Sequence, residues 1–245
     1  MRQFGLIGYP LSHSFSQQYF SDKFLRENIA DATFLNFSIP HVSEVKQVFE
    51  NHPLLKGLAV TIPYKKSIMP FLDEIDDAAK EINACNCIKI QQNKKKGFNT
   101  DIIGFEKSFA KNLKPHHKKA LVLGTGGASA AVQYVLKKLG IEYLLVSRES
   151  SINTITYGDI SPVIFTEFNV IINCTPIGTY PNVMQAPLLP YGLLSDTHYL
   201  FDLVYNPPLT GFLQYGKEAG STIENGYEML VFQAEENWKI WNSGT

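Results

Sequence analysis

An apolar run followed by a glycine-rich turn, over residues 119–129, restricts the fold of this chain more than any other feature. Ala120-Leu121-Val122-Leu123 is continuously apolar, as expected of a parallel strand that is covered on both faces. Gly124-Thr125-Gly126-Gly127-Ala128-Ser129 follows, and then a helical pattern over residues 130–139. Such a strand, turn and helix present free backbone amides to a pyrophosphate. The segment therefore predicts a dinucleotide-binding unit, although Ser129 stands where a third glycine is usual.

Strand-like and helical patterns alternate along the rest of the chain, which predicts an α/β fold with mainly parallel sheets. In the first hundred residues we expect strands at 4–7, 33–39 and 58–62, helices at 16–28, 43–50, from Tyr64 and at 73–82, and a hairpin of 85–91 with 96–99. Beyond them we expect helices at 102–113 and 227–241 and strands at 143–147, 170–174, 199–203 and 222–223. No helix is predicted between residues 150 and 167, so the nucleotide unit is expected to be shortened there.

These patterns predict two α/β lobes with a cleft between them. We place the first lobe at residues 1–101 and expect the C-terminal helix, at 226–245, to pack back onto it. Residues 102–225 form the second lobe, a Rossmann-like, doubly wound dinucleotide-binding domain.

Composition and charge exclude several classes of protein. Apolar residues make up 44% of the 245 residues and charged residues 18%, so a disordered chain is excluded. The formal net charge of −1 gives no electrostatic basis for binding nucleic acid or an anionic membrane. The basic cluster at residues 111–119 contains no aromatic residue for base stacking and is interpreted as a solvated connector.

Cysteine content and hydropathy point to a cytoplasmic protein. An odd number of cysteines, three, makes a disulfide framework unexpected, and we interpret Cys85, Cys87 and Cys174 as small core residues. No compact cluster of metal-binding side chains accompanies them, so no metal site is predicted. The apolar run at the N-terminus is too short for the core of a signal peptide, and no apolar stretch is long enough to span a bilayer.

The tip of the second strand of the nucleotide unit bears on the choice of cofactor. It reads Val146-Ser147-Arg148-Glu149. An acidic residue at this tip binds the ribose hydroxyl of NAD, whereas an arginine accommodates the 2′-phosphate of NADP. Arg148 therefore favours NADP. NAD remains an alternative cofactor, because Glu149 is adjacent to Arg148 and the next basic residue in the chain is Lys217.

Two segments of the first lobe carry residues suited to chemistry. Val60-Thr61-Ile62-Pro63-Tyr64-Lys65 ends a predicted strand in a lysine, and Asn99-Thr100-Asp101 ends another in an aspartate. A cationic general acid, a carboxylate and a dinucleotide site together indicate hydride transfer to or from an oxygen-bearing carbon. The alternative for Lys65 is a solvent-facing residue beside Lys66.

A serine-rich run opens the first predicted helix: Gly8-Tyr9-Pro10-Leu11-Ser12-His13-Ser14-Phe15-Ser16. The hydroxyls of Ser12 and Ser14 and the free amides of the helix could hold a small carboxylate. Simple capping of the helix is the alternative, since serine is a favoured cap.

These segments resemble the shikimate dehydrogenase family, and the resemblance covers nearly the whole chain. Besides the runs at 8–16, 60–65, 99–101 and 124–129, it rests on the segments Asn83-Ala84-Cys85-Asn86-Cys87, Asn173-Cys174-Thr175-Pro176-Ile177-Gly178, Asp202-Leu203-Val204-Tyr205-Asn206-Pro207 and Asn225-Gly226-Tyr227-Glu228-Met229-Leu230-Val231-Phe232-Gln233-Ala234. Eight segments in the family's order make the match specific.

The resemblance implies reversible reduction of 3-dehydroshikimate to shikimate by NADPH, in the biosynthesis of chorismate and the aromatic amino acids. Lys65 and Asp101 match the family's catalytic pair. The positions implied for the substrate are Ser12, Ser14, Thr61, Asn86, Tyr205 and Gln233. Those implied for the cofactor are Gly124, Thr125, Gly126, Gly127, Ala128, Ser129, Arg148, Thr175 and Gly226. A small-molecule substrate, no metal, and a monomer or homodimer complete the expectation.

Besides the shortened segment between residues 150 and 167, the chain departs from the family's pattern in two places. Ile102 follows Asp101 where the family usually has glycine, and the turn at Arg148 lacks a second basic residue. The change at Ile102 is expected to affect local packing rather than chemistry, whereas the missing basic residue bears on the choice of NADP. A quinate or dual quinate/shikimate dehydrogenase that uses NAD is an alternative. A non-catalytic sensor that binds a cyclohexene acid or a nucleotide is the more remote one, and retention of both Lys65 and Asp101 argues against it.

Overall fold

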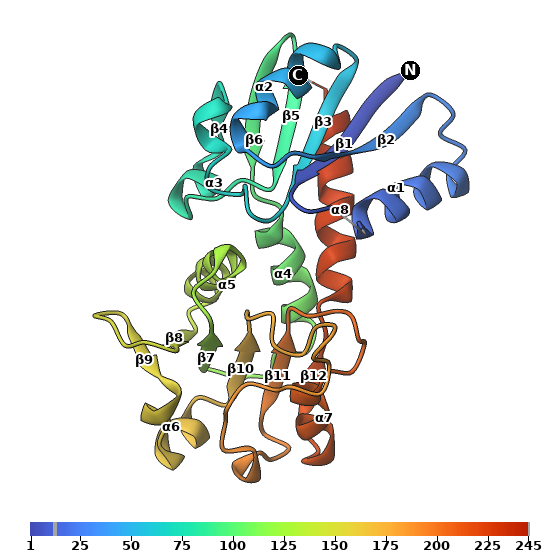
Figure 1. The fold of residues 1–245 in the computed structure, drawn as a ribbon. Helices are drawn as coiled ribbons and strands as arrows, with labels where there is room; N and C mark the ends of the chain where they lie inside the picture. The colour runs from blue at the N-terminus through green and yellow to red at the C-terminus, as the bar shows by residue number, and fades with distance from the viewer. Residues whose placement is uncertain (12–13, 245) are drawn as a thin grey trace. The chain divides into compact units, whose positions relative to one another are not determined.

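The computed structural model describes residues 1–11 and 14–244, and Ser12 and His13 lie outside this part. The chain divides into two compact units, each built on a six-stranded sheet. Unit 1 comprises Met1–Thr100 with Ala234–Thr245, and unit 2 comprises Asp101–Gln233. Helix α8, Tyr227–Asn242, therefore contributes residues to both units (Figure 1). The predicted α/β fold with two parallel-sheet regions is confirmed.

The sheet of unit 1 has the order β2-β1-β3-β5-β6-β4. Its parallel part contains β1 (Arg2–Gly8), β2 (Ala32–Ser38) and β3 (Leu55–Val60). The predicted hairpin adds antiparallel strands β5 (Cys87–Gln91) and β6 (Lys94–Phe98), and the short β4 (Glu74–Ile75) pairs parallel to β6.

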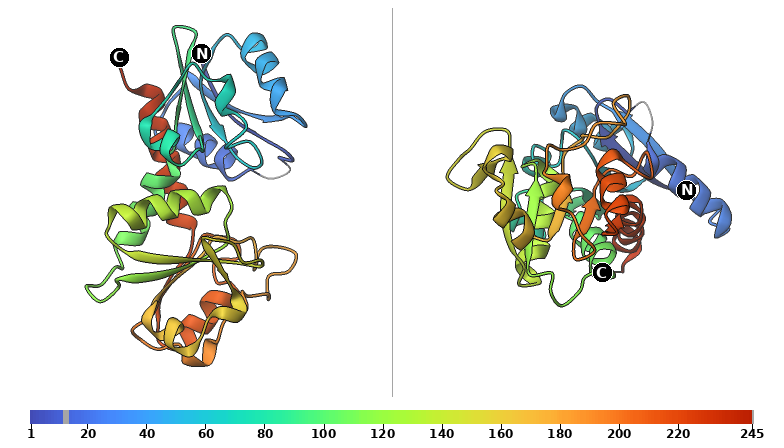
Figure 2. Two further views of the ribbon diagram at one scale, coloured as in Figure 1. Left: turned by 90° about the vertical axis from the view of Figure 1, so that its left-hand side faces the viewer. Right: turned by 90° about the horizontal axis from the view of Figure 1, so that it is seen from below.

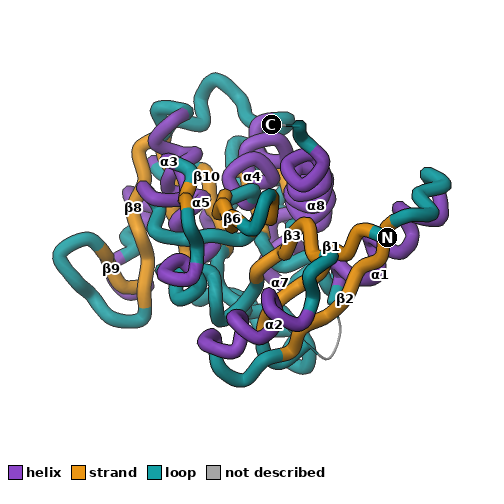
Figure 3. Tube along the Cα trace, turned by 90° about the horizontal axis from the view of Figure 1, so that it is seen from above, coloured by secondary structure: helices purple, strands orange, loops and turns teal. Residues whose placement is uncertain are grey.

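Helices cover both faces of this sheet. The helix α1 (Phe15–Arg26) and the C-terminal half of α8 pack on one face, where Phe4, Phe20 and Trp241 are buried together. The η1 turn (Val42–Glu44) and α2 (Val45–Asn51) lie over the other face with the 3₁₀-helix η2 (Met69–Phe71) (Figure 3). The short α3 (Asp77–Glu81) begins where Asp76 Oδ1 accepts a hydrogen bond from the amide of Ala78 at 3.1 Å.

The sheet of unit 2 is parallel throughout and has the order β12-β11-β10-β7-β8-β9. Its strands are β7 (Lys119–Leu123), β8 (Glu142–Ser147), β9 (Thr154–Thr156), β10 (Val170–Asn173), β11 (Tyr199–Asp202) and β12 (Thr222–Glu224). The chain runs outward from β7 through β8 to β9, then returns to β10 on the other side of β7. This is the strand order of a dinucleotide-binding Rossmann sheet, in which the order reverses between β7 and β10.

Helices also cover both faces of the second sheet, as Figure 2 shows. The helices α4 (Asp101–Ala110) and α5 (Gly127–Lys138) lie on one face, where Phe105 and Phe109 pack against Phe201 and Tyr199. The helices α6 (Pro162–Glu167) and α7 (Gly211–Glu218), with the turns η3 (Tyr157–Asp159) and η4 (Tyr191–Leu193), lie on the other. Among the described residues, no helix combines the length and apolarity that crossing a membrane requires.

Two sequence-based predictions of local structure were wrong, and a third placed the start of a helix too early. A helix, α6, does lie between residues 150 and 167. Its start is fixed by Ser161, whose Oγ accepts from the amide of Ile164 at 3.3 Å, and by Pro162 in the first helical position. The predicted helix from Tyr64 is instead a series of turns that leads into η2, and the helix predicted at 73–82 begins only after β4.

Candidate functional site

A cavity of about 400 Å³ lies in unit 2 at the carboxyl ends of β7, β8 and β10. Ligands of open α/β sheets bind in the crevice where the strand order reverses, and here that point lies between β7 and β10. Its lining consists of Gly124, Thr125, Gly126, Val146, Ser147, Arg148, Tyr157, Cys174, Thr175, Pro176 and Ile177.

The glycine-rich turn forms one wall of this cavity, and its geometry requires glycine. Gly124 has φ +96°, and a Cβ there would lie 2.9 Å from Thr175 Cγ2. A Cβ on Gly126 or Gly127 would meet no atom within 4 Å, so open space lies beside the first turn of α5. The first amides of a helix have no partner within the helix and carry its positive dipole end. These residues therefore fit the pyrophosphate of a dinucleotide.

Five of the predicted cofactor-binding residues meet at the cavity, namely Gly124, Thr125, Gly126, Arg148 and Thr175. Gly127 and Ala128 open helix α5, and Ser129 is buried there, where its Oγ accepts from Gln133 Nε2 at 3.1 Å. Gly226 is not among the residues that line the cavity. A Cβ at this position would lie 2.2 Å from the carbonyl oxygen of Leu203. Its need for glycine is thus a packing requirement, and its role toward the cofactor stays a prediction.

Sequence reasoning missed Tyr157 as part of this wall. Tyr157 stands in η3, after β9, and is half-buried beside Arg148. Burial raises the pKa of its hydroxyl, which therefore stays protonated and can donate a hydrogen bond into the cavity. The segment gave no signal because neither β9 nor η3 is long enough to show a periodic pattern.

Cys174 was predicted as a core residue, but it is half-buried and lines the cavity. Burial and the nearby carboxyl of Asp202 raise the pKa of its thiol, so the thiol stays protonated and is a poor nucleophile. Cys85 and Cys87 are buried, as expected.

A buried polar network behind the cavity fixes Thr175. Asn173 Oδ1 accepts from the amide of Thr175 at 3.0 Å, and Asn173 Nδ2 donates to Asp202 Oδ1 at 2.9 Å. Asp202 also accepts from the amide of Val204 at 3.0 Å and from Thr210 Oγ1 at 2.6 Å. Asn173, Asp202 and Thr210 are fully buried. The ends of β10 and β11 are thereby joined by side-chain hydrogen bonds, which hold the segment that carries Thr175.

The carboxyl of Asp202 should make folding pH-dependent. Burial raises its pKa from 3.8 to about 6, against the lowering effect of hydrogen bonds from Thr210, Val204 and Asn173. A carboxyl whose folded pKa is raised stabilises the fold when protonated, and that stability is lost as the pH rises from about 4 through about 6. The loss corresponds to about 3 kcal/mol for such a shift. Urea unfolding of Asp202→Asn and the parent chain at several pH values should show this difference over that window, and parallel curves would contradict the shift.

In unit 1, hydrogen bonds anchor the backbone on both sides of the Thr61–Lys65 segment. The amide of Thr61 donates to the carbonyl of Ile7 at 2.9 Å, and the carbonyl of Lys65 accepts from the amide of Cys85 at 2.7 Å. Lys65 is half-buried, whereas the neighbouring Lys66 is exposed. The two lysines are therefore in different environments, which counts against reading Lys65 as an ordinary solvent-facing residue.

Asn86 links three segments of unit 1. It is 3% exposed, its amide donates to Phe98 O at 3.1 Å, and its carbonyl accepts from the amide of Val60 at 2.8 Å. Asn86 Oδ1 also accepts from the amide of Thr100 at 2.7 Å. Asp101 follows Thr100 directly, begins α4 and is 6% exposed. Asn86 thus fixes the backbone of Thr100, which is the residue directly before Asp101, the predicted catalytic carboxylate.

The remaining predicted substrate positions are spread over several elements. Ser14 caps α1, since its Oγ accepts from the amide of Gln17 at 3.1 Å, which establishes capping as one of its roles. Ser12 lies outside the described residues. In unit 2, Gln233 is 8% exposed and packs beside Gly104, whose Cβ would lie 3.1 Å from that of Gln233. Tyr205 is 37% exposed, and burial raises the pKa of its hydroxyl.

A family model and two relatives that match this chain all carry the name shikimate dehydrogenase. Residues 6–88 match the family described as the shikimate dehydrogenase substrate binding domain. A protein of Aquifex aeolicus named shikimate dehydrogenase (NADP(+)) is 37% identical over 250 residues, which span 98% of this chain and 90% of that protein. A protein of the same name from Methanococcus vannielii is 34% identical over 258 residues, 97% of this chain and 90% of that protein.

Solved structures agree with the sequence comparison. The crystal structure of shikimate dehydrogenase from Aquifex aeolicus superimposes with a TM-score of 0.87 at 34% identity and covers 99% of this chain and 92% of that one. The Thermus thermophilus shikimate 5-dehydrogenase, in complex with NADP(H) and shikimate, gives a TM-score of 0.87 at 26% identity, with coverage of 99% and 94%. On this evidence, the chain belongs to the shikimate dehydrogenase family.

Proposed function

We propose that this chain catalyses the NADP-dependent, reversible reduction of 3-dehydroshikimate to shikimate, a step toward chorismate and the aromatic amino acids. The observation that carries the proposal is the cavity at the point of strand-order reversal, lined by the glycine-rich turn and by Arg148. Relatives that match this chain over nearly its whole length are named shikimate dehydrogenase (NADP(+)).

The cofactor would be held by unit 2. Gly124, Thr125 and Gly126, with the first turn of α5, would bind the pyrophosphate, and Arg148 would pair with the 2′-phosphate. Thr175, fixed by Asn173, would contact the cofactor from the end of β10. When bound, NADPH supplies the hydride for reduction of a ketone, and NADP accepts it in the reverse direction.

Lys65 would handle the proton of the reaction. As an ammonium group it stabilises negative charge that develops on the substrate oxygen and then donates a proton to that oxygen. In the reverse direction the neutral amine accepts the proton from the hydroxyl. Asp101 would orient the lysine and the substrate as a carboxylate partner. This assignment needs no metal, because the lysine performs the polarisation that a Lewis acid performs in other dehydrogenases.

The substrate would be held by hydroxyl and amide side chains. Ser12 and Ser14 would bind its carboxylate, and Thr61, Asn86, Tyr205 and Gln233 would surround its ring hydroxyls. The fixed positions of Thr61 and Asn86 in unit 1 support this assignment, because their backbones are tied to neighbouring strands. We further propose that the enzyme acts in the cytoplasm, as a monomer or homodimer.

The test of this function is a set of four initial rates, with shikimate or quinate as the acid and NADP or NAD as the acceptor. We expect the shikimate–NADP pair to give the largest kcat/KM. A preference for quinate or for NAD would instead indicate a quinate or dual quinate/shikimate dehydrogenase. Absence of turnover from folded protein that binds NADP would favour a non-catalytic sensor.

Replacing Arg148 tests the cofactor assignment. Arg148→Gln removes the one cation in the described lining of the unit 2 cavity. A charge-assisted hydrogen bond contributes about 1.5–3 kcal/mol, so the KM for NADP should rise by about tenfold to a hundredfold. The KM for NAD, which lacks the 2′-phosphate, should change little. Arg26→Gln, an exposed arginine of α1, is the matched control. Equal effects on NADP and NAD would count against a 2′-phosphate contact.

A further inference from the structure

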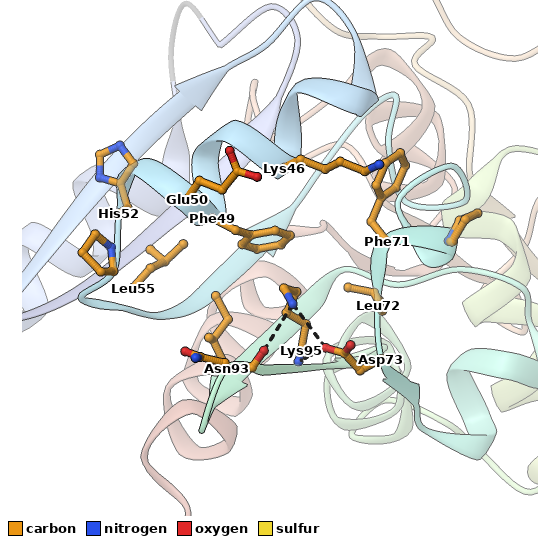
Figure 4. A pocket seen from close by; sticks show the side chains of 13 residues that line it. Lys46, Phe49, Glu50, His52, Leu55, Phe71, Leu72, Asp73, Asn93 and Lys95 are labelled. Atoms are coloured by element: carbon orange, nitrogen blue, oxygen red, sulfur yellow. Dashed lines mark hydrogen bonds and ion pairs between the residues drawn. The ribbon is translucent and has the colours of Figure 1, made fainter.

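A second cavity, of about 490 Å³, lies entirely within unit 1 (Figure 4). Three segments that are separate in the sequence form it: α2 with the loop that leads from it into β3, the end of η2 with the residues after it, and the β5–β6 hairpin. None of its lining residues is among those proposed for substrate, cofactor or catalysis. The cavity therefore needs an explanation of its own.

The deep part of the cavity is apolar. Leu55 of β3 is 3% exposed and belongs to the hydrophobic core of unit 1. Phe49 and Phe71 pack against that core from α2 and η2 and are only partly buried, so each has ring surface that the core does not cover. An apolar or aromatic group could therefore enter between these rings and remove their remaining surface from water.

Charged groups of both signs stand around this apolar part. The α2 side carries Lys46 and Glu50, and the opposite side carries Lys95 and Asp73, as the sticks in Figure 4 show. The ammonium of Lys95 lies 3.3 Å from Asp73 Oδ2 and 5.5 Å from the centroid of Phe49. The ammonium of Lys46 lies 5.8 Å from the centroid of Phe71. Within the described part of the chain, neither Lys46 nor Glu50 forms an ion pair.

This arrangement selects among ligand classes by charge. Each side of the cavity offers one ammonium and one carboxylate, so the four groups sum to zero charge. A phosphate or a simple carboxylic acid would satisfy the lysines but would face Glu50 and Asp73. An amine would have the opposite mismatch. A zwitterion matches both kinds of group, and only a zwitterion with a large apolar side chain also fills the space beside Phe49 and Phe71.

We propose that this cavity binds a free amino acid with an aromatic side chain. Its carboxylate pairs with the ammonium of Lys46, its ammonium pairs with Glu50, and its ring packs against Phe49 and Phe71. The Lys95–Asp73 pair, held by a second hydrogen bond from the amide of Lys95 to Asp73 Oδ2 at 2.7 Å, closes the opposite side. The proposal does not depend on the dehydrogenase reaction, and each can fail without the other.

Calorimetric titration of the full chain with L-phenylalanine tests this site. We expect a dissociation constant of about 1 mM or tighter, as is usual for a ligand of this size. Phenethylamine, which lacks the carboxylate, and 3-phenylpropionate, which lacks the ammonium, should each bind at least about tenfold more weakly. The amino acid without a ring, L-alanine, should show no measurable binding.

Two exposed residues allow the position to be tested without disturbing the fold. Lys46→Gln and Glu50→Gln should each weaken L-phenylalanine binding by about tenfold. Lys56→Gln, an exposed lysine of β3 that does not line the cavity, should leave the affinity unchanged. The proposal would be overturned by an absence of binding, by equal binding of L-phenylalanine and 3-phenylpropionate, or by an affinity that neither cavity variant changes.

Discussion

Lys65→Ala should lower kcat for shikimate oxidation by at least about a hundredfold, because general acid–base catalysis typically contributes a factor of about 10² to 10⁴. The residues that line the unit 2 cavity are untouched by the change, so the dissociation constant for NADP should stay within about twofold of the parent value. Steady-state kinetics with shikimate and NADP, together with a direct titration of NADP, give both quantities.

The chain supplies its own control for this prediction. Lys66 is adjacent in sequence and exposed, and Lys66→Ala should keep nearly all of the activity. If Lys65→Ala retained most of its turnover, or if both variants lost activity equally, Lys65 would not be the proton donor. A loss of NADP binding in Lys65→Ala would also contradict the account, since it would point to a general structural defect.

Trp241→Ala should lower the free energy of unfolding by about 3–5 kcal/mol, the usual cost of removing a large aromatic side chain from a core. Trp241 is 5% exposed, and its ring stacks on Phe4 at a centroid distance of 5.1 Å. Its Nε1 donates to the carbonyl of Ile88 at 3.0 Å. The ring also lies directly against Gly57, where a Cβ would come within 2.2 Å of it. The truncation therefore leaves a cavity and removes a buried side-chain hydrogen bond to β5.

Urea unfolding followed by circular dichroism measures this effect. Lys239→Ala, an exposed position on the same helix, should change the unfolding free energy by less than about 0.5 kcal/mol. A destabilisation of Trp241→Ala smaller than about 1 kcal/mol would mean that α8 is not held to the sheet of unit 1 by this residue.

The nucleotide unit could be predicted because its signals are local. The strand β7 is apolar at four consecutive positions, and the turn that follows it requires glycine at Gly124, where φ is +96°. Such features are determined within a dozen residues, so the sequence alone reveals them. The short helix α6 gave no such signal, because six residues are fewer than two helical turns and cannot display a helical period.

The error at Tyr64 has a tertiary cause. Tyr64 and Ile68 are four residues apart and both buried, which resembles the apolar stripe of a helix. The carbonyl of Lys65, however, accepts its hydrogen bond from Cys85, and the amide of Met69 donates to Lys66. A pairing with a segment twenty residues away in the sequence thus replaces the helical hydrogen bond. Local propensity contains no information about such a partner.

The candidate sites also differ in how far the sequence predicts them, because only some of their residues belong to a local pattern. Arg148 and Thr175 follow strands whose carboxyl ends share one edge of a parallel sheet, so sequence reasoning could place them together. Tyr157 reaches the same cavity only because β9 pairs with β8. The unit 1 cavity combines three segments that are separate in the sequence, and no pattern within any one of them indicates that they meet.

The most direct measurement is the product formed when the purified chain is incubated with 3-dehydroshikimate and NADPH. Nuclear magnetic resonance identifies the organic product, and absorbance follows the oxidation of NADPH. The account predicts that shikimate forms in an amount equal to the NADPH consumed. Unchanged 3-dehydroshikimate in the presence of folded protein that binds NADPH would contradict it.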